Sequence, residues 1–293
     1  MTMFENYCGC GPSANTRILS GSVSTGPPRK PLRISRIIVL KSLGPQLIPF
    51  TQAACIYFVL FLPHDAISAV ACFIKCLPII SLICFVILHG NVLPTTTKIG
   101  TDNPSTYSRW ILAGLVFSAV GDAFLQFSAA GYFIPGMAAF GLAHVCYAVA
   151  FGVQPVHPLS GVIIFALAGS VFACLLPYLP GMFTYAVGVY LVLVSFMGWR
   201  AIARVPFLND LWTWTKLACA VGALLFCLSD LMIAIKMFYS DFPLSQVLIM
   251  TTYYVAQMGI AVSVVEGQLR PTPSSNSGSR SPTPPPTLVE RCG

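Results

Sequence analysis

GLVFSAVGDAFL, residues 114–125, and GALLFCLSDLMIA, residues 222–234, are two apolar stretches that each contain a single aspartate. In both, a glycine (Gly114, Gly222) stands eight residues before the aspartate (Asp122, Asp230), and a small residue directly precedes it. A charged side chain at the centre of a membrane helix costs about 3 kcal/mol or more, so such residues are usually functional. The repeated pattern predicts a duplicated unit with its chemistry near the middle of the protein.

The rest of the sequence is typical of a membrane protein. It is 56% apolar and only 9% charged, with a mean hydropathy of +0.79, whereas a soluble domain has about 25% charged residues. We therefore expect an all-α polytopic membrane helical bundle with eight transmembrane helices, most of them close to the ~20 residues that cross a bilayer. The predicted spans are residues 46–62, 67–90, 109–128, 132–153, 160–177, 181–199, 211–236 and 244–265.

The two ends of the chain are polar and rich in Gly, Ser and Pro, which predicts disorder. Residues 1–45 form the predicted leader, 46–266 the membrane catalytic domain and 267–293 the tail. Eight spans place both termini on one side, and the positive-inside rule makes that side cytoplasmic. Only Lys236 is expected on the opposite side. The termini side collects Arg17, Arg29, Lys30, Arg33, Arg36, Lys41, Lys98, Arg109, Arg200, Arg204, Arg270, Arg280 and Arg291.

The spans divide into two halves of four, with an aspartate in the third span of each half. His144 follows Asp122 by 22 residues, and Tyr253 follows Asp230 by 23 residues. Because four is an even number, the halves would be parallel repeats rather than inverted ones.

Polar residues of five spans are expected at a similar depth, in the outer half of the membrane, from a rise of about 1.5 Å per residue. They are Lys75, Asp122, His144, Asp230 and Tyr253. Agreement in depth indicates a convergent pocket. The candidate catalytic residues are Asp122, Asp230 and His144. The candidate substrate-binding residues are Lys75, Ser118, Tyr147, Ser229, Tyr253 and Gln257.

Each candidate also has a structural interpretation. The aspartates could be tied to Lys75 or to backbone groups, and His144 could be a satisfied interior histidine. The tyrosines could be packing residues. Lys75 could pair with a carboxylate or hold an anionic group of a substrate.

Other classes of function are disfavoured. The basic residues are divided between flexible tails and short loops, which argues against nucleic-acid binding. The eleven cysteines have no zinc-ligand spacing beside histidines and are interpreted as buried thiols. We predict no metal and no cofactor.

An ordered set of motifs from about Lys41 to Glu266 resembles the lysoplasmalogenases, the YhhN-like membrane proteins, and their animal members in particular. The motifs are IKCLP at 74–78, GLVFSAVGDAFL at 114–125, GYFIPGMAAFGLAHVCYAVAFG at 131–152, FTYAVGVY at 183–190, GALLFCLSDL at 222–231 and IMTTYYVAQ at 249–257. Cys76 departs from many bacterial relatives, which have Pro there. The resemblance implies hydrolysis of the vinyl ether bond of a lysoplasmalogen within the bilayer, with water as co-substrate and an endoplasmic reticulum location. The products would be a fatty aldehyde and glycerophosphoethanolamine or glycerophosphocholine. Head-group preference and oligomeric state stay open.

Vinyl ethers hydrolyse by protonation at carbon, followed by capture of an oxocarbenium ion by water. Two acids in one low-dielectric pocket tend to take different protonation states, which would supply a proton donor and a negative group beside the cation. We therefore expect Asp122 and Asp230 to face one another in a shared chamber. The main alternative is a proton-coupled transporter of small molecules or lipids. A metal-dependent hydrolase using Asp122, His144 and Asp230 comes next, and a structural scaffold is the fourth possibility.

Overall fold

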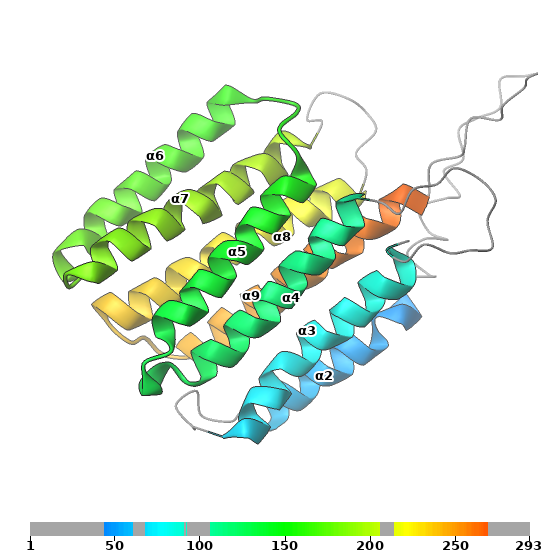
Figure 1. The fold of residues 1–293 in the computed structure, drawn as a ribbon, viewed down its shortest axis with the longest axis horizontal. Helices are drawn as coiled ribbons and strands as arrows, with labels where there is room; N and C mark the ends of the chain where they lie inside the picture. The colour runs from blue at the N-terminus through cyan, green and yellow to red at the C-terminus, as the bar shows by residue number, and fades with distance from the viewer. Residues whose placement is uncertain (1–43, 61–67, 91, 93–105, 206–213, 269–293) are drawn as a thin grey trace, which may run out of the picture. The chain divides into compact units, whose positions relative to one another are not determined.

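The structure is a computed structural model that describes residues 44–60, 68–90, 92, 106–205 and 214–268. Every regular element in these ranges is helical (Figure 1). The all-α prediction is therefore confirmed for the described part of the chain. The leader 1–45 and the tail 267–293 lie almost wholly outside it, so their predicted disorder stays a prediction.

Eight helices occupy the positions of the eight predicted spans. They are α2 (Ile48–Leu60), α3 (Ala69–His89), α4 (Thr106–Gln126), α5 (Phe133–Phe151), α6 (Pro158–Leu175), α7 (Met182–Ala203), α8 (Trp214–Ala234) and α9 (Ser245–Val262). Short 3₁₀ turns η1 (Ser128–Ala130), η2 (Leu176–Tyr178) and η4 (Ser263–Gln268) extend some of them. A π-helical turn, η3 (Ile235–Tyr239), continues α8.

Seven of the eight helices are long and apolar enough to cross a membrane, and α2 is the exception. The predicted span 46–62 covers 17 residues, whereas α2 has 13, about 20 Å at 1.5 Å per residue. That is less than the ~30 Å hydrocarbon core. The prediction of eight transmembrane helices is thus not confirmed: seven described helices qualify as spans, and α2 is followed only as far as Leu60, where this described range ends.

The closest packing occurs within two helix pairs, α4 with α5 and α8 with α9. A Cβ atom added at Gly114 would lie 2.2 Å from the Tyr147 ring of α5. A Cβ atom at Gly222 would lie 2.7 Å from the Ala256 carbonyl oxygen of α9. The glycine eight residues before each aspartate therefore lets a neighbouring helix approach closely, as small residues do in membrane bundles.

The two predicted halves also interlock: α3 packs against α9, and α5 packs against α7. By contrast α6 packs mainly on α7 and is only 11% buried, whereas most of the other candidate spans are 44–56% buried. The aspartate-bearing helices are central, and α6 lies at an edge of the bundle (Figure 1).

Candidate functional site

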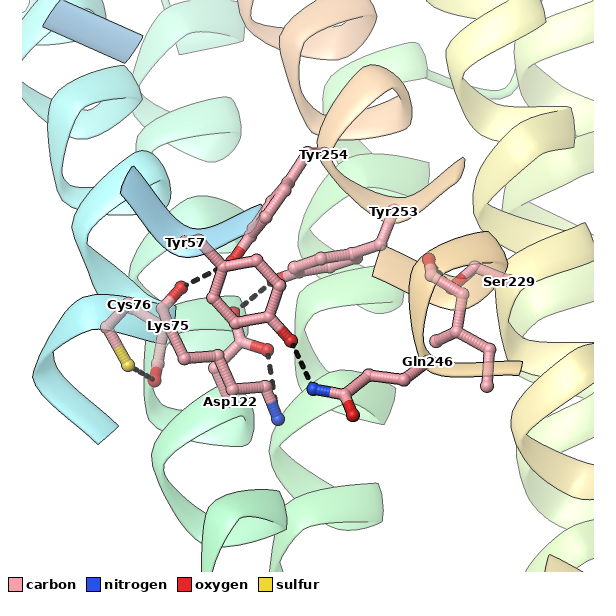
Figure 2. Close-up of polar contacts among 10 residues, drawn as sticks. Tyr57, Lys75, Cys76, Asp122, Ser229, Gln246, Tyr253 and Tyr254 are labelled. Atoms are coloured by element: carbon pink, nitrogen blue, oxygen red, sulfur yellow. Dashed lines mark hydrogen bonds and ion pairs between the residues drawn. The ribbon is translucent and has the colours of Figure 1, made fainter. Parts of the chain in front are cut away.

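Asp122 is the centre of a closed polar cluster, which we call the Asp122 cluster: Lys75, Asp122 and Tyr253. The Tyr253 hydroxyl donates a hydrogen bond to Asp122 Oδ2 at 2.6 Å. Lys75 Nζ lies 4.0 Å from Oδ1, within ion-pair range but too far for a direct hydrogen bond. These side chains converge from α3, α4 and α9 (Figure 2), and all are at least 96% buried. The cation and hydroxyl compensate the buried carboxylate, as removal of a charge from water requires.

Further contacts hold α3 in place beside this cluster. The Tyr254 hydroxyl donates to the Lys75 carbonyl oxygen at 2.8 Å. The Cys76 thiol donates to the Ala119 carbonyl oxygen at 3.7 Å. Gln246 Nε2 donates to the Tyr57 hydroxyl at 3.1 Å and so links α9 to α2 (Figure 2). The position of Lys75 is therefore fixed from several helices.

Asp230 is the centre of a second cluster, which we call the Asp230 cluster: His144, Tyr190 and Asp230. His144 Nε2 lies 3.1 Å from Asp230 Oδ2. The Tyr190 hydroxyl donates to the same oxygen at 3.0 Å and also lies 3.0 Å from His144 Nε2. The histidine side chain is fully buried, whereas the Asp230 side chain is 11% exposed. The three groups come from α5, α7 and α8.

Asp230 and Tyr190 lie on the wall of a cavity of about 280 Å³. The cavity is bounded by α5, α6, α7 and α8 and is almost entirely apolar. Its remaining lining residues include Met137, Phe140, Leu167, Ala168, Val187, Val194, Ser195, Gly198, Leu224, Cys227, Leu228 and Phe238. Asp122 and Lys75 are not among them. Of the two carboxylates, the one in the Asp230 cluster is therefore accessible to an apolar ligand.

The two clusters have the same plan in the two halves of the chain. Each aspartate, on the third helix of its half, contacts a residue of the second helix of the same half: Lys75 for Asp122 and Tyr190 for Asp230. Each also contacts a residue of the fourth helix of the other half: Tyr253 for Asp122 and His144 for Asp230. The plan is shared, but the side chains that complete it differ.

Aromatic rings lie between the two clusters. The Phe226 ring centroid is 4.8 Å from that of His144 and 5.4 Å from that of Tyr253. Phe140 contacts both Phe226 and Tyr253. The structure thus distributes the aspartates over two clusters, instead of pairing them across the shared chamber that the sequence led us to expect. The buried rings of Phe226 and Phe140 therefore lie between groups of the two clusters.

The four remaining predicted site residues make hydrogen bonds outside the two clusters. They are Ser118, Tyr147, Ser229 and Gln257. The Tyr147 hydroxyl donates to Gln257 Oε1 at 2.7 Å and lies 3.5 Å from Ser118 Oγ. The Ser229 hydroxyl donates to the Ile249 carbonyl oxygen at 3.2 Å and holds α8 against α9. All four side chains are buried, and none of them lines the cavity.

Two residues of the site were not among the sequence candidates. Tyr190 ends the motif FTYAVGVY, and its signal was a tyrosine in the middle of a predicted span. Phe226 stands four residues before Asp230, in a stretch where a phenylalanine is unremarkable. Its place between the clusters depends on how α5, α8 and α9 pack.

The metal alternative required Asp122, His144 and Asp230 to meet. Within the described ranges, no three His, Cys, Asp or Glu side chains come close enough to hold a metal ion. The donor set proposed for that alternative is divided between the two clusters.

Comparison with known proteins gives the chain its family. The profile of the YhhN family matches residues 70–264, which is more than half of the sequence. The chain belongs to the YhhN family. The matched range contains the Asp122 cluster and the Asp230 cluster and excludes α2. The resemblance found from the motifs is thereby confirmed.

Animal members of the YhhN family are similar over most of their length. Lysoplasmalogenase TMEM86A of Bos taurus is 47% identical over 235 residues, which are 80% of this chain and 95% of the relative. Lysoplasmalogenase TMEM86A of Homo sapiens is 47% identical over 239 residues, with the same coverage. Lysoplasmalogenase TMEM86B of Homo sapiens is 34% identical over 227 residues, 77% of this chain and 89% of the relative. No solved structure gives a significant match.

The Asp122 cluster predicts a measurable coupling between Lys75 and Asp122. Lys75→Met leaves a buried carboxylate without its cation and should lower stability by about 3–5 kcal/mol. The double variant Lys75→Met/Asp122→Asn should recover most of that loss, because a neutral amide needs no counter-ion. The apparent unfolding midpoint in detergent micelles measures both effects. Lys236→Met, at a half-exposed lysine, is the matched control. A single variant as stable as this control, or a double variant no better than the single, would contradict the coupling.

Proposed function

We propose that the protein is a lysoplasmalogenase, an ether hydrolase that converts a lysoplasmalogen and water to a fatty aldehyde and glycerophosphoethanolamine or glycerophosphocholine. The names of its similar relatives support this proposal. The structural observation that supports it best is a hydrogen-bonded carboxyl group on the wall of an apolar membrane cavity.

The reaction requires a proton at carbon and a negative group beside the resulting cation. Both contacts of the Asp230 carboxyl group are made to Oδ2, so we assign Oδ1 to the substrate. Protonated Asp230 would transfer its proton to the alkene carbon. The carboxylate left behind, held by His144 and Tyr190, would stabilise the oxocarbenium ion. It would then accept a proton from the water that attacks this ion.

His144 is suited to support Asp230 as a neutral ring. Its Nδ1 is buried and has no hydrogen-bond partner among the described residues. A proton on Nε2 therefore avoids burying an unpaired N–H group, which costs about 1–3 kcal/mol. In this tautomer Nε2–H donates to Asp230, and the pair could return a proton to the glycerol oxygen when the hemiacetal collapses.

We assign Asp122 a supporting role. It is paired with Lys75 and lies in the cluster on the other side of Phe226. The remaining proposed binding residues, Ser118, Tyr147, Ser229 and Gln257, would likewise act by positioning α4, α5, α8 and α9 around the cavity. The transporter alternative is not favoured, because both aspartates lie within continuous helices and not at helix breaks.

The first test of the proposed function is substrate discrimination. Purified protein should release aldehyde from a lysoplasmalogen and leave the saturated-ether lysolipid intact, because only the vinyl ether can be protonated to an oxocarbenium ion. Asp230→Asn should lower turnover by about 10²- to 10⁴-fold, as expected for loss of a general acid. Asp122→Asn should lower it less, and Asp241→Asn, outside the helices, should not lower it. Cleavage of both lipids or of neither would reject the proposed function.

The second test concerns the hydroxyl of Tyr190. Tyr190→Phe removes one hydrogen bond to the carboxylate, and such bonds to charged groups contribute about 1.5–3 kcal/mol. Turnover should therefore fall by about 10- to 100-fold. Tyr185→Phe, on the same helix but 80% exposed, should retain the wild-type rate. Equal rates for the two variants would remove Tyr190 from the mechanism.

We also propose that the protein resides in the endoplasmic reticulum with both termini cytoplasmic. This topology requires the segment around α2 to complete an eighth crossing, since seven crossings place the ends on opposite sides. Tags fused to the two ends should both be digested by protease added to sealed microsomes. Protection of one tag alone would establish an odd number of crossings.

A further inference from the structure

Hydrolysis requires a water molecule inside a cavity whose walls are almost entirely apolar. Purely apolar cavities stay dry, and a buried water typically makes about three hydrogen bonds to polar groups. Among the lining residues, the side chains with a hydroxyl, thiol or carboxyl group are Tyr190, Ser195, Cys227 and Asp230. The side chains that can hold a water beside the substrate are therefore few.

Most of these groups already make hydrogen bonds within the protein. The Tyr190 hydroxyl donates to Asp230 Oδ2 at 3.0 Å. The Cys227 thiol donates to the Val194 carbonyl oxygen at 3.7 Å. Among the described residues, neither Asp230 Oδ1 nor the Ser195 hydroxyl has a hydrogen-bond partner. These two oxygens are therefore the ones available to a molecule in the cavity.

The free hydroxyl of Ser195 is unusual, because this residue is only 5% exposed. A helical serine can satisfy its hydroxyl by donating to the carbonyl oxygen one turn earlier. Ser81 and Ser170 do so, at 3.0 and 2.9 Å, whereas Ser195 does not. Leu191 and Gly198 line the cavity one turn before and one turn after it, which places Ser195 on the cavity face of α7. A buried hydroxyl without a protein partner on this face indicates a partner inside the cavity.

Ser195 also lies near the height of Asp230 in the bundle. Helices α7 and α8 pack together, and the contacts of Tyr190 with Asp230 and of Val194 with Cys227 show that they run antiparallel. From the second contact, Ser195 is one residue along α7 and Asp230 is three residues along α8, in opposite directions. The axial separation is therefore about 6 Å at 1.5 Å per residue. Both side chains tilt toward the N-terminus of their own helix and so lean toward each other. One water with two hydrogen bonds of about 2.8 Å can span such a gap.

We propose that Ser195 holds the attacking water molecule between its own hydroxyl and Asp230. Asp230 first gives its proton to the alkene carbon. As the water oxygen bonds to the oxocarbenium carbon, a water proton passes to the Asp230 carboxylate, which leaves a neutral hemiacetal and a protonated acid. The Ser195 hydroxyl keeps its own proton and contributes one hydrogen bond to the water. The inference rests on the proposed function and adds the residue that positions the second substrate.

A competing nucleophile tests this role. Methanol captures the same oxocarbenium ion as a mixed acetal, so the ratio of mixed acetal to aldehyde measures how well the site positions water. In dilute methanol, Ser195→Ala should raise this ratio by about three- to tenfold, as expected for loss of one neutral hydrogen bond. Ser195→Thr keeps the hydroxyl and should retain the wild-type ratio. So should the control Ser170→Ala, at an exposed serine of α6 outside the cavity.

Folding is followed in the same variants. Because the hydroxyl removed in Ser195→Ala has no partner in the described protein, the unfolding midpoint in detergent should not fall. A lower midpoint would show that the hydroxyl is structural and would overturn the proposal. An unchanged acetal ratio in Ser195→Ala, or an equally raised ratio in Ser195→Thr, would overturn it as well.

A binding experiment separates this inference from the proposed function. The probe is a lysolipid in which CH₂ replaces the ether oxygen and the adjacent chain carbon has a hydroxyl group, so that it mimics the hemiacetal and cannot be cleaved. Its affinity for Ser195→Ala should be about three- to tenfold lower than for the wild type, whereas the analogue without the hydroxyl should bind both equally. Equal affinities for the hydroxylated probe would overturn the role of Ser195. Wild-type protein that shows the expected difference but cleaves no lysoplasmalogen would retain the Ser195 site and reject the proposed function.

Discussion

A carboxyl group inside a membrane bundle must find its partners on other helices, because lipid offers none. Asp122 and Asp230 each bring two further helices together in this way: α3 and α9 around the first, α5 and α7 around the second. The glycines eight residues before the aspartates let α5 pack closely on α4 and α9 pack closely on α8. The arrangement of the central helices follows from satisfying these two side chains.

The two clusters meet the same requirement with different chemistry. At Asp122 a lysine and a tyrosine leave the carboxylate neutralised and enclosed. At Asp230 the partners are a histidine and a tyrosine, and the side chain keeps an exposed edge on the cavity. A common plan in both halves supports the inference of a parallel duplication. Under the proposed function, Asp122 would stabilise the bundle and Asp230 would take part in the reaction.

The position of Asp230 beside an apolar cavity suits a lipid whose reactive bond lies between its chain and its glycerol group. Under the proposed function the apolar walls would hold the chain, and the low dielectric would strengthen the hydrogen bonds to the carboxyl group. Phe226 separates Asp230 from the lysine-bearing cluster.

The sequence by itself determined the membrane class, the positions of the helices, the family and the buried polar residues, because burial of a charge in lipid is costly wherever the chain folds. It also indicated that His144 and Tyr253 occupy equivalent positions in the two halves, because each follows the aspartate of its half by a similar number of residues. Only the tertiary structure decided which aspartate each would contact and that Tyr190 completes the Asp230 cluster. Pairing across the halves, the aromatic layer around Phe226 and the cavity beside α6 arise from helix packing, which depends on contacts between residues far apart in the chain.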